Sequence, residues 1–493
     1  MGGVFGVVSQ QDCVSDLFYG TDYHSHLGTR RGGLAVANGP GFTRFIHNIE
    51  NAQFRSKFED DIQKMRGTRG IGVISDTAAQ PLLIGSHLGT YAIVTVGRIN
   101  NTDELVAAAF GRRSTHFLEM DGGAINPTEL IATLINQGKT FEAGIRLAQE
   151  AIDGSCSLLL LTADGVIAAR DLHGRTPLVV GRGEGSLCVT GESCALPNLG
   201  YVAEHELGPG EIVHMDSRQW STVTPPSPVL QICAFLWVYY GYPASSYEGV
   251  NVEVMRNRSG RLLARADDVQ VDLVAAIPDS GVAHAIGYAN ESRVPYGRPF
   301  VKYTPTWARS FTPQNQQRRD LVASMKLVPI RELIQRQRLL FCEDSIVRGT
   351  QLQGTIRRLL HGGALEVHMR PACPPLVYGC RFLNFSRSSS ESDLAARRAI
   401  TELEGGEPDP ATLARYCVHG SAEYAAMVER IRTRLQLTSL RYQTMKDMLR
   451  AIGLPRECVC TYCWNAAPGP SLQTSIHFQA GDTRDGTEAG CLW

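Results

Sequence analysis

The chain has 493 residues, which is too long for one ordinary hydrophobic core and predicts two or more domains. Its formal net charge of −1 gives no indication of a surface that binds polyanions such as nucleic acids. Because no run of about 18 apolar residues occurs, we expect no membrane span. The chain begins without the basic and apolar regions of a secretory signal, so we expect a cytoplasmic protein.

The first part of the chain is rich in short strand-like segments. Residues 91–96 and 157–161 are apolar runs of strand length with many β-forming residues. A proline-rich stretch at 222–228 breaks the pattern and marks a domain boundary. The expected units are a first domain at 1–225, a second domain at 226–470 and a flexible tail at 471–493.

Beyond this boundary, helical and strand-like segments alternate. The expected strands are 273–277, 300–302 and 339–342, and the expected helices are 256–267 and 350–360. This alternation predicts an α/β, doubly wound parallel sheet with helices on both faces. Ligands in such sheets bind at the carboxyl ends of the strands.

The third of these strands leads directly into a polar loop. Glu343 and Asp344 follow the strand, Ser345 comes next, and Gly349 precedes a helix that begins at Thr350. A helix N-terminus after a glycine turn presents backbone N–H groups to a phosphate. The two carboxylates would repel a phosphate, but they suit sugar hydroxyls or a positive charge that develops on a sugar.

Residues 339–350 resemble the phosphoribosylpyrophosphate motif of the glutamine phosphoribosylpyrophosphate amidotransferase family. Further segments, at 170–178, 192–196, 277–281, 302–311 and 325–327, are similar to other motifs of this family, and the likeness extends from about residue 2 to residue 465. It implies an N-terminal-nucleophile-hydrolase-like four-layer αββα domain followed by a type I phosphoribosyltransferase domain. Glu343 is a departure, because the family commonly has Asp there.

The resemblance also implies roles for individual residues. The residues expected to bind the substrate are Asp279, Ser280, Lys326, Ser345, Arg348, Gly349 and Thr350. Those expected in catalysis are Lys302, Arg309, Glu343 and Asp344, with Mg²⁺ linked to the last two. The basic residues Lys302 and Arg309 lie on a segment similar to the family's lid, which neutralises the departing pyrophosphate once water is excluded.

The nitrogen-supplying chemistry of the family is missing from the first domain. Gly2 stands where the family has its nucleophilic cysteine, and glycine has no side chain with which to attack glutamine. Ser75 replaces the arginine that holds the substrate, Val96 replaces the asparagine of the oxyanion hole, and Pro127 stands near the position of a further substrate-binding acid. We therefore expect an inactive pseudo-glutaminase that supports the transferase, binds a regulator or docks a separate glutaminase.

Four cysteines resemble the ligands of the family's iron–sulfur subgroup. They are Cys233, Cys373, Cys460 and Cys463, although the second aligns only with a small shift and Cys380 flanks the same segment. A set of four thiolates suits a [4Fe–4S] cluster or Zn²⁺. Unligated thiols are the third alternative.

Two functions from different classes remain open. The first is an enzyme that makes 5-phosphoribosylamine from phosphoribosylpyrophosphate with ammonia, free or from a partner, with purine nucleotides as inhibitors. The second is a non-catalytic sensor of phosphoribosylpyrophosphate or nucleotides that regulates purine synthesis. An ordinary glutamine-dependent enzyme is disfavoured by the residues at positions 75 and 96. We expect a homo-oligomer.

Overall fold

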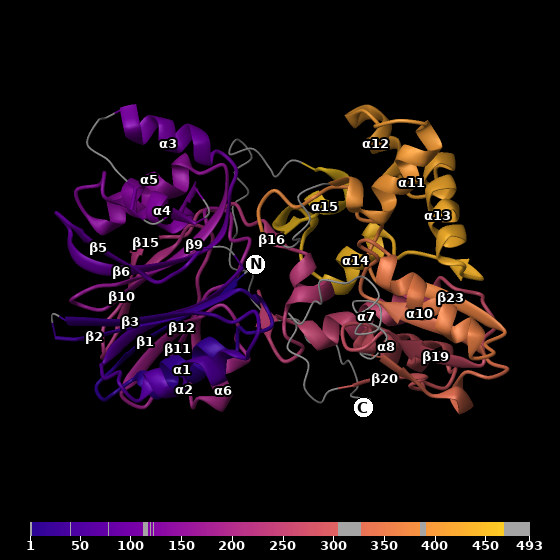
Figure 1. Cartoon of the computed structure of the whole chain (residues 1–493), viewed down its shortest axis with the longest axis horizontal. Helices are drawn as coiled ribbons and strands as arrows, with labels where there is room; N and C mark the ends of the chain where they lie inside the picture. Colours follow the sequence, from indigo (N-terminus) through magenta and orange to yellow (C-terminus); the bar gives the residue numbers. More distant parts are fainter. Residues whose placement is uncertain are drawn as a thin grey trace, which may run out of the picture.

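Two lobes lie side by side in the computed structural model (Figure 1). The structure describes residues 2–39, 41–76, 78–111, 117–118, 120–121, 123–303, 327–384 and 391–467. The earlier part of the chain forms the first lobe, here called the first domain, and the later part forms the second domain. Across these ranges, no helix combines the length and the apolar character needed to cross a membrane.

The first domain contains two antiparallel sheets. The larger sheet has seven strands in the order β13 (Val202–Glu206), β11 (Val179–Gly183), β12 (Ser186–Thr190), β1 (Gly2–Ser9), β4 (Arg69–Ser75), β2 (Arg31–Asn38) and β3 (Gly41–Asn48). The other has six strands in the order β15 (Trp220–Thr224), β14 (Ile212–Met215), β10 (Val166–Ala169), β9 (Gly154–Leu161), β6 (Gly89–Ile99) and β5 (Leu82–Ser86). A two-stranded hairpin is formed by β7 (Met120–Asp121) and β8 (Ala124–Ile125).

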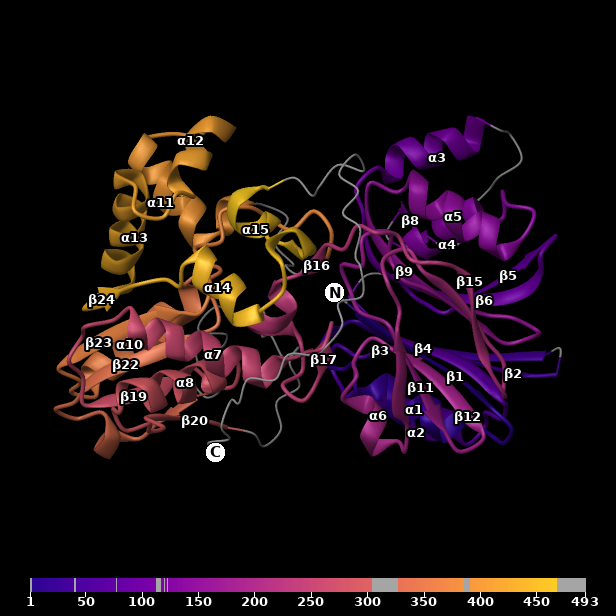
Figure 2. The same cartoon turned by 180° about the vertical axis from the view of Figure 1, so that it is seen from behind.

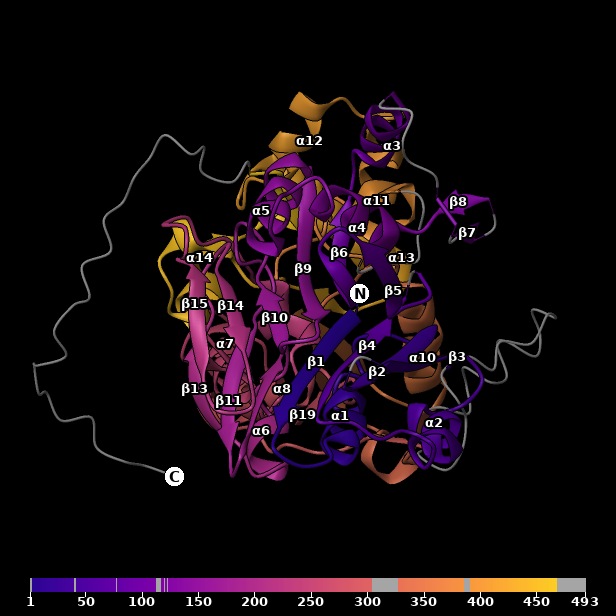
Figure 3. The same cartoon turned by 90° about the vertical axis from the view of Figure 1, so that its left-hand side faces the viewer.

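The two sheets pack face to face, and helices cover their outer faces. Val4, Val94 and Leu159 belong to the apolar core between the sheets. The helices of the first domain are α1 (Val14–Asp22), α2 (Phe54–Ile62) and α6 (Ala195–Asn198) beside the larger sheet, and α3 (Thr102–Gly111), α4 (Pro127–Ile135) and α5 (Phe141–Ala151) beside the other. Figure 3 shows the sheets between these helical layers. The expected four-layer αββα arrangement is confirmed.

A short junction connects the two domains. β16 (Ile232–Cys233) pairs in parallel with β25 (Val459–Cys460) from the far end of the described chain. A π-helical turn, η1 (Leu236–Tyr240), follows, and then a hairpin of β17 (Ser246–Tyr247) and β18 (Val250–Asn251). Figure 2 shows β16 and β17 between the two lobes. The junction therefore combines segments more than 200 residues apart.

The second domain is built on a parallel sheet. Its strands are β19 (Leu273–Ala276), β22 (Arg338–Glu343), β23 (Glu366–Pro371) and β24 (Ser439–Leu440), in that order. One face is covered by α7 (Val252–Arg265) and α8 (Val282–Ser292), and the other by α10 (Thr350–His361), α11 (Ala395–Glu404) and α13 (Ala422–Leu435). The expected doubly wound sheet is therefore confirmed.

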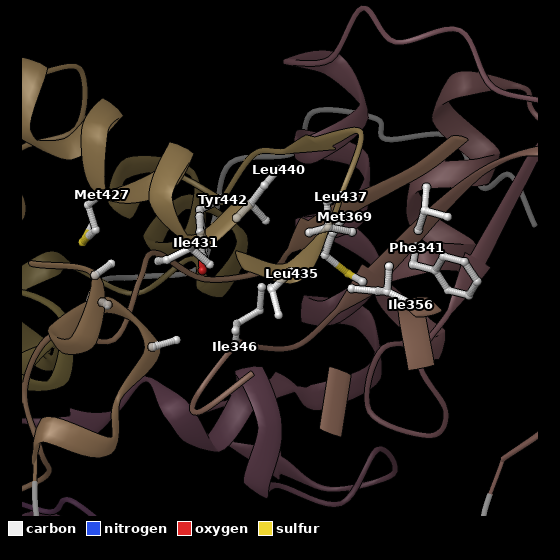
Figure 4. Close-up of a cluster of buried hydrophobic side chains, with 14 of the residues drawn as sticks. Phe341, Ile346, Ile356, Met369, Met427, Ile431, Leu435, Leu437, Leu440 and Tyr442 are labelled. Atoms are coloured by element: carbon white, nitrogen blue, oxygen red, sulfur yellow. The ribbon is translucent and has the colours of Figure 1, made fainter. Parts of the chain in front are cut away.

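Short helices and single turns complete this domain. They are η2 (Arg331–Leu333), η3 (Glu391–Asp393), α12 (Pro410–Tyr416), α14 (Met445–Ile452), η4 (Arg456–Cys458) and α15 (Tyr462–Asn465). Figure 4 shows how the C-terminal helices pack on the sheet: Phe341 and Met369 of the sheet lie in one cluster with Ile356 of α10 and with Ile431 and Leu435 of α13.

One expected strand does not join the parallel sheet. β20 (Phe300–Lys302) pairs antiparallel with β21 (Leu327–Pro329) in a separate two-stranded ribbon. At the sheet edge, Tyr296 instead forms an isolated parallel bridge with Val274. The prediction that residues 300–302 join the parallel sheet was wrong, because the backbone of β20 hydrogen-bonds to β21 instead. The local pattern of apolar residues does not encode this pairing.

A buried ion pair joins β23 to the end of α7. Arg370 and Asp267 have side chains only 2% and 0% exposed. Arg370 Nη2 donates to Asp267 Oδ1 at 3.1 Å, and the Tyr288 hydroxyl donates to Oδ2 at 2.8 Å. Burial raises the pKa of Asp267, but the hydrogen bonds and charge of Arg370 outweigh burial and hold this pKa below its ordinary value.

Replacing Arg370 with Met should destabilise the second domain by about 3–5 kcal/mol, because it leaves a buried carboxylate short of its main counter-charge. Among the described residues, Arg441 would be the remaining cation paired with Asp267, at 3.4 Å, and the Tyr288 hydroxyl would remain as a donor. Thermal unfolding followed by circular dichroism measures the change. The double variant D267N/R370M should recover part of the loss. A single variant that melts with the wild type would contradict the prediction.

Candidate active site

The carboxyl ends of β19 and β22 bring two polar segments together. Asp279 and Ser280 follow β19, while Glu343 and Asp344 end β22, the neighbouring strand. Ser280 Oγ donates a hydrogen bond to Asp344 Oδ1 at 2.5 Å, and Ser345 Oγ donates to Asp344 Oδ2 at 2.6 Å. The parallel register therefore collects these candidate substrate residues at one edge of the sheet, where ligands of such sheets bind.

Neither of the two acids at this edge forms an ion pair with another described residue. Glu343 is 8% exposed and Asp344 5%. Burial first, and then the charge of Asp344, raises the pKa of Glu343 well above its ordinary value. In the described ranges, Lys302 pairs with Asp279, and no ion pair includes Glu343 or Asp344. Such a pair suits a cationic ligand, whether Mg²⁺ or the charge that develops on a ribose.

Beside the acids, the chain forms a turn that can hold a phosphate. Gly349 has a φ of +74°, a left-handed conformation that glycine adopts without strain, and it caps α10 directly before Thr350. The first N–H groups of α10 are therefore directed toward the loop. Arg348 points to the C-terminal helices, where its Nη2 lies 3.8 Å from Asp393 Oδ2.

The candidate lid can be followed only at its two ends. Lys302 closes β20 and forms an ion pair with Asp279, so its ammonium group reaches the same edge of the sheet as the loop. The described residues resume at Leu327, the first residue of β21. Arg309 and Lys326, both expected at the substrate, lie outside the described residues.

In the first domain, Gly2 has no space for a side chain. It pairs with Ser75 across β1 and β4. A Cβ atom on Gly2 would lie 2.4 Å from the carbonyl oxygen of Ile74 and 3.2 Å from Val96 Cγ1. The first distance is far below any van der Waals contact, and the obstacle is backbone. The local structure is therefore built around glycine at this position.

The space near the same strands contains a side chain that the sequence did not single out. Gln80 is 1% exposed, and its Nε2 donates to Thr95 O at 3.0 Å while its Oε1 accepts from Thr95 N at 2.7 Å. Nε2 also lies 3.4 Å from Ser75 Oγ, and Thr95 Oγ1 hydrogen-bonds Thr128 Oγ1 at 2.8 Å. An amide of the protein itself thus occupies the region between positions 75 and 96.

Four thiols meet at the junction between the domains. Burial first, and then the neighbouring Cys460 and Cys380, raises the pKa of the Cys233 thiol well above its ordinary value. A hydrogen bond with Cys463 lowers the pKa of Cys380 to about 7. The parallel pairing of β16 with β25 places Cys233 directly beside Cys460. The tertiary structure thus groups Cys233, Cys380, Cys460 and Cys463.

The structure places Cys373 elsewhere. Ala372 N donates to Glu343 O at 2.8 Å, so Cys373 follows β23 into the core, where its buried thiol lies near Asp344 and Trp464. Cys380 comes after the next turn and contacts Cys463 instead. Sequence alignment alone did not distinguish these two cysteines.

No three His, Cys, Asp or Glu side chains of the described ranges are spaced to hold a single metal ion. The thiolates of a cluster bind different iron atoms, so they need not converge on one centre. A buried cation supports such an occupant: Arg175 is 4% exposed, and its Nε and Nη1 have no hydrogen-bond partner in the described structure. The donor set and this orphaned cation therefore fit an anionic thiolate cluster.

Comparisons with known proteins agree with this geometry. Residues 68–198 match the family model described as a glutamine amidotransferase domain. The amidophosphoribosyltransferase of Mycobacterium bovis is 30% identical over 94% of this chain and 85% of its own length. That of Methanocaldococcus jannaschii is 29% identical over 82% of this chain and 90% of its own.

A solved structure shows the same fold. The glutamine phosphoribosylpyrophosphate amidotransferase from B. subtilis, complexed with ADP and GMP, is 24% identical and aligns with a TM-score of 0.80 over 96% of this chain and 99% of that one. Sequence likeness along nearly the whole chain and a shared two-domain architecture lead to one conclusion: the chain belongs to the amidophosphoribosyltransferase family.

Proposed function

We propose that this amidophosphoribosyltransferase makes 5-phosphoribosylamine, in purine nucleotide biosynthesis, from phosphoribosylpyrophosphate and ammonia without glutaminase chemistry of its own. The observation that carries the proposal is a contrast between the domains. The second keeps a buried acid pair, Glu343 and Asp344, beside an open helix N-terminus. In the first, Gly2 is closely surrounded and Gln80 fills the neighbouring space.

Each part of the loop has a role in this reaction. The C1–O bond to pyrophosphate breaks, a C1–N bond to ammonia forms, and the nitrogen gives up a proton. Asp344 and Glu343 stabilise the positive charge that develops on the ribose. The N–H groups at Gly349 and Thr350 bind the 5-phosphate. Mg²⁺, when bound near the two acids, would neutralise the pyrophosphate.

The remaining candidate residues act on the two ends of the substrate. Lys302, with Arg309 and Lys326 from the segment that follows it, neutralises the leaving pyrophosphate. Asp279 and Ser280 position the pyrophosphate side of the substrate.

The nitrogen then comes from free ammonia or from a separate glutaminase docked on this chain. Purine nucleotides are the proposed inhibitors, since the B. subtilis relative was solved with ADP and GMP.

We further propose that Cys233, Cys380, Cys460 and Cys463 hold a [4Fe–4S] cluster. Their support is proximity at the junction together with a buried, unpaired cation beside them. When bound, the cluster supplies a net negative charge and connects three distant segments of the chain. Iron and sulfide analysis of anaerobically purified protein tests this assignment directly.

The nitrogen source that the protein accepts distinguishes the candidate functions. Purified protein with Mg²⁺ and phosphoribosylpyrophosphate should release pyrophosphate with ammonium chloride but not with glutamine. The physical reason is that no side chain at position 2 can attack an amide. A coupled pyrophosphate assay measures the rate. Nucleotide binding without turnover on either nitrogen source would instead favour a regulatory protein, and turnover with glutamine alone would overturn the proposal.

Neutralising Asp344 should remove most of the activity. D344N keeps the shape but loses the charge that stabilises the ribose cation, and we expect kcat/KM with ammonia to fall about 100-fold or more. D268N is a matched control, because Asp268 is 93% exposed and its contact with Arg441 is a surface ion pair. Equal rates for D344N and D268N would contradict the role of Asp344.

Restoring a cysteine at position 2 should not restore glutaminase activity. In G2C the new Cβ meets the Ile74 carbonyl at 2.4 Å, so we expect a lower melting temperature and no glutamine-dependent ammonia release. G85C is the control: the same change in β5, where nothing lies within 4 Å of the added atom, should melt with the wild type. Glutamine hydrolysis by G2C would contradict this prediction, because it would show that the first domain needs only a nucleophile at position 2 to be active.

A further inference from the structure

The first domain holds one of the cysteine segments of the second domain. Three hydrogen bonds between side chains and backbone join residues 97–100, at the end of β6, to residues 380–384: Arg98 Nη1 to Cys380 O at 2.7 Å, Asn100 Nδ2 to Arg381 O at 2.9 Å, and Asn384 Nδ2 to Gly97 O at 3.2 Å. Arg381 also pairs with Asp153 at 2.9 Å. The segment that follows Val96, where the family has its oxyanion hole, is thus used here as a contact between domains.

A loop of the first domain reaches the same place. Asp171 is 1% exposed and shapes this loop, since its carboxylate accepts from the backbone N–H groups of His173 at 2.9 Å and Arg175 at 2.6 Å. Cys233 N then donates to Arg175 O at 3.2 Å. Because Cys233 also pairs with Cys460 across β16 and β25, Arg175, Cys233 and Cys460 lie on three adjacent segments.

The Arg175 guanidinium lies against the fourth segment. Its central carbon is 3.5 Å from the centroid of the Phe382 ring, in a cation–π contact. Phe382 lies two residues after Cys380, and the backbone carbonyl of Arg175 accepts from Cys233 N, so the guanidinium is held among the cysteine segments. Nε and Nη1 have no hydrogen-bond partner, and the guanidinium forms no ion pair among the described residues.

A buried guanidinium without a counter-charge is unfavourable, because burial removes its hydration. The carboxylate of Asp171 does not relieve this cost through the guanidinium, since its hydrogen bonds go to backbone N–H groups. Four thiolates around an iron–sulfur core carry the opposite charge at the required place. An anionic group beside Nε and Nη1 would supply the partner that these atoms lack in the described structure.

We propose that Arg175 of the first domain is the charge-balancing residue of the cluster held by Cys233, Cys380, Cys460 and Cys463, and that Arg98 and Asn100 position the Cys380 segment. This inference rests on the cluster assignment in the proposed function. It gives the first domain a task that needs no glutaminase chemistry. Arg175 is a positioning residue: it acts on the ligands and has no contact with phosphoribosylpyrophosphate.

Anaerobic reconstitution of the full chain with Fe²⁺ and sulfide tests the proposal. R175M keeps the bulk of the side chain and removes its charge. We expect its cluster to be lost on exposure to air about 10-fold or more faster than in the wild type, in line with outer-shell substitutions at other metal sites. Its midpoint potential should be more negative, because a buried cation stabilises the added electron. R175K, which keeps the charge, should recover most of both effects.

R182M is the matched control, since Arg182 of the same domain is 44% exposed and pairs with Glu204. Should R175M not fold, by circular dichroism, R98A loosens the Cys380 segment without touching the core and should also speed cluster loss. If R175M, or R98A in its place, equals R182M in loss rate and potential, the proposal is overturned.

A wild-type protein that takes up no iron overturns the cluster assignment and this inference with it. Ammonia-dependent pyrophosphate release, measured on the same samples, reports on the proposed function separately.

Discussion

A buried charge must meet an opposite charge, and this constraint accounts for both candidate sites of the protein. Glu343 and Asp344 are buried side by side at the end of β22 and form no ion pair in the described structure. Their position next to the N-terminus of α10 explains the arrangement: the helix end attracts a phosphate, whereas the acids attract a cation. A ligand with a phosphate at one end and a sugar that becomes cationic satisfies both requirements at once.

The same constraint acts with opposite sign at the junction between the domains. Arg175 is a buried cation whose Nε and Nη1 have no partner in the described structure, and its guanidinium stacks on Phe382, close to Cys380 in the chain. The junction also joins the start of the second domain to the far end of the described chain, because β16 pairs with β25. An anionic occupant would therefore balance Arg175 and hold the two domains together through one contact region.

The first domain is closely packed around the glycine at position 2. Its two sheets keep a continuous apolar core that includes Val4, Val94 and Leu159. Between positions 75 and 96, the Gln80 amide bonds both backbone groups of Thr95. Because these bonds satisfy buried polar groups, the filled site is stable by itself.

The sequence by itself determined the elements with strong local signals. The buried strand that ends at Glu343, the glycine turn at Gly349 and the helix that begins at Thr350 depend on residues close in the chain, so periodicity and turn chemistry predicted them and the loop between them. The absence of a nucleophilic side chain at position 2 also follows from the sequence alone, because residue 2 is glycine.

Only the tertiary structure decided which distant residues meet. In the structure, residues 300–302 pair outside the parallel sheet, and Cys380 rather than Cys373 contacts Cys463. The Gln80 amide bonds Thr95, and the Arg175 guanidinium is buried with two unpartnered nitrogens. The physical reason is common to all of these. Pairing across a sheet edge, thiol proximity and the cost of a buried charge depend on separations in space, and local pattern in the chain carries no information about them.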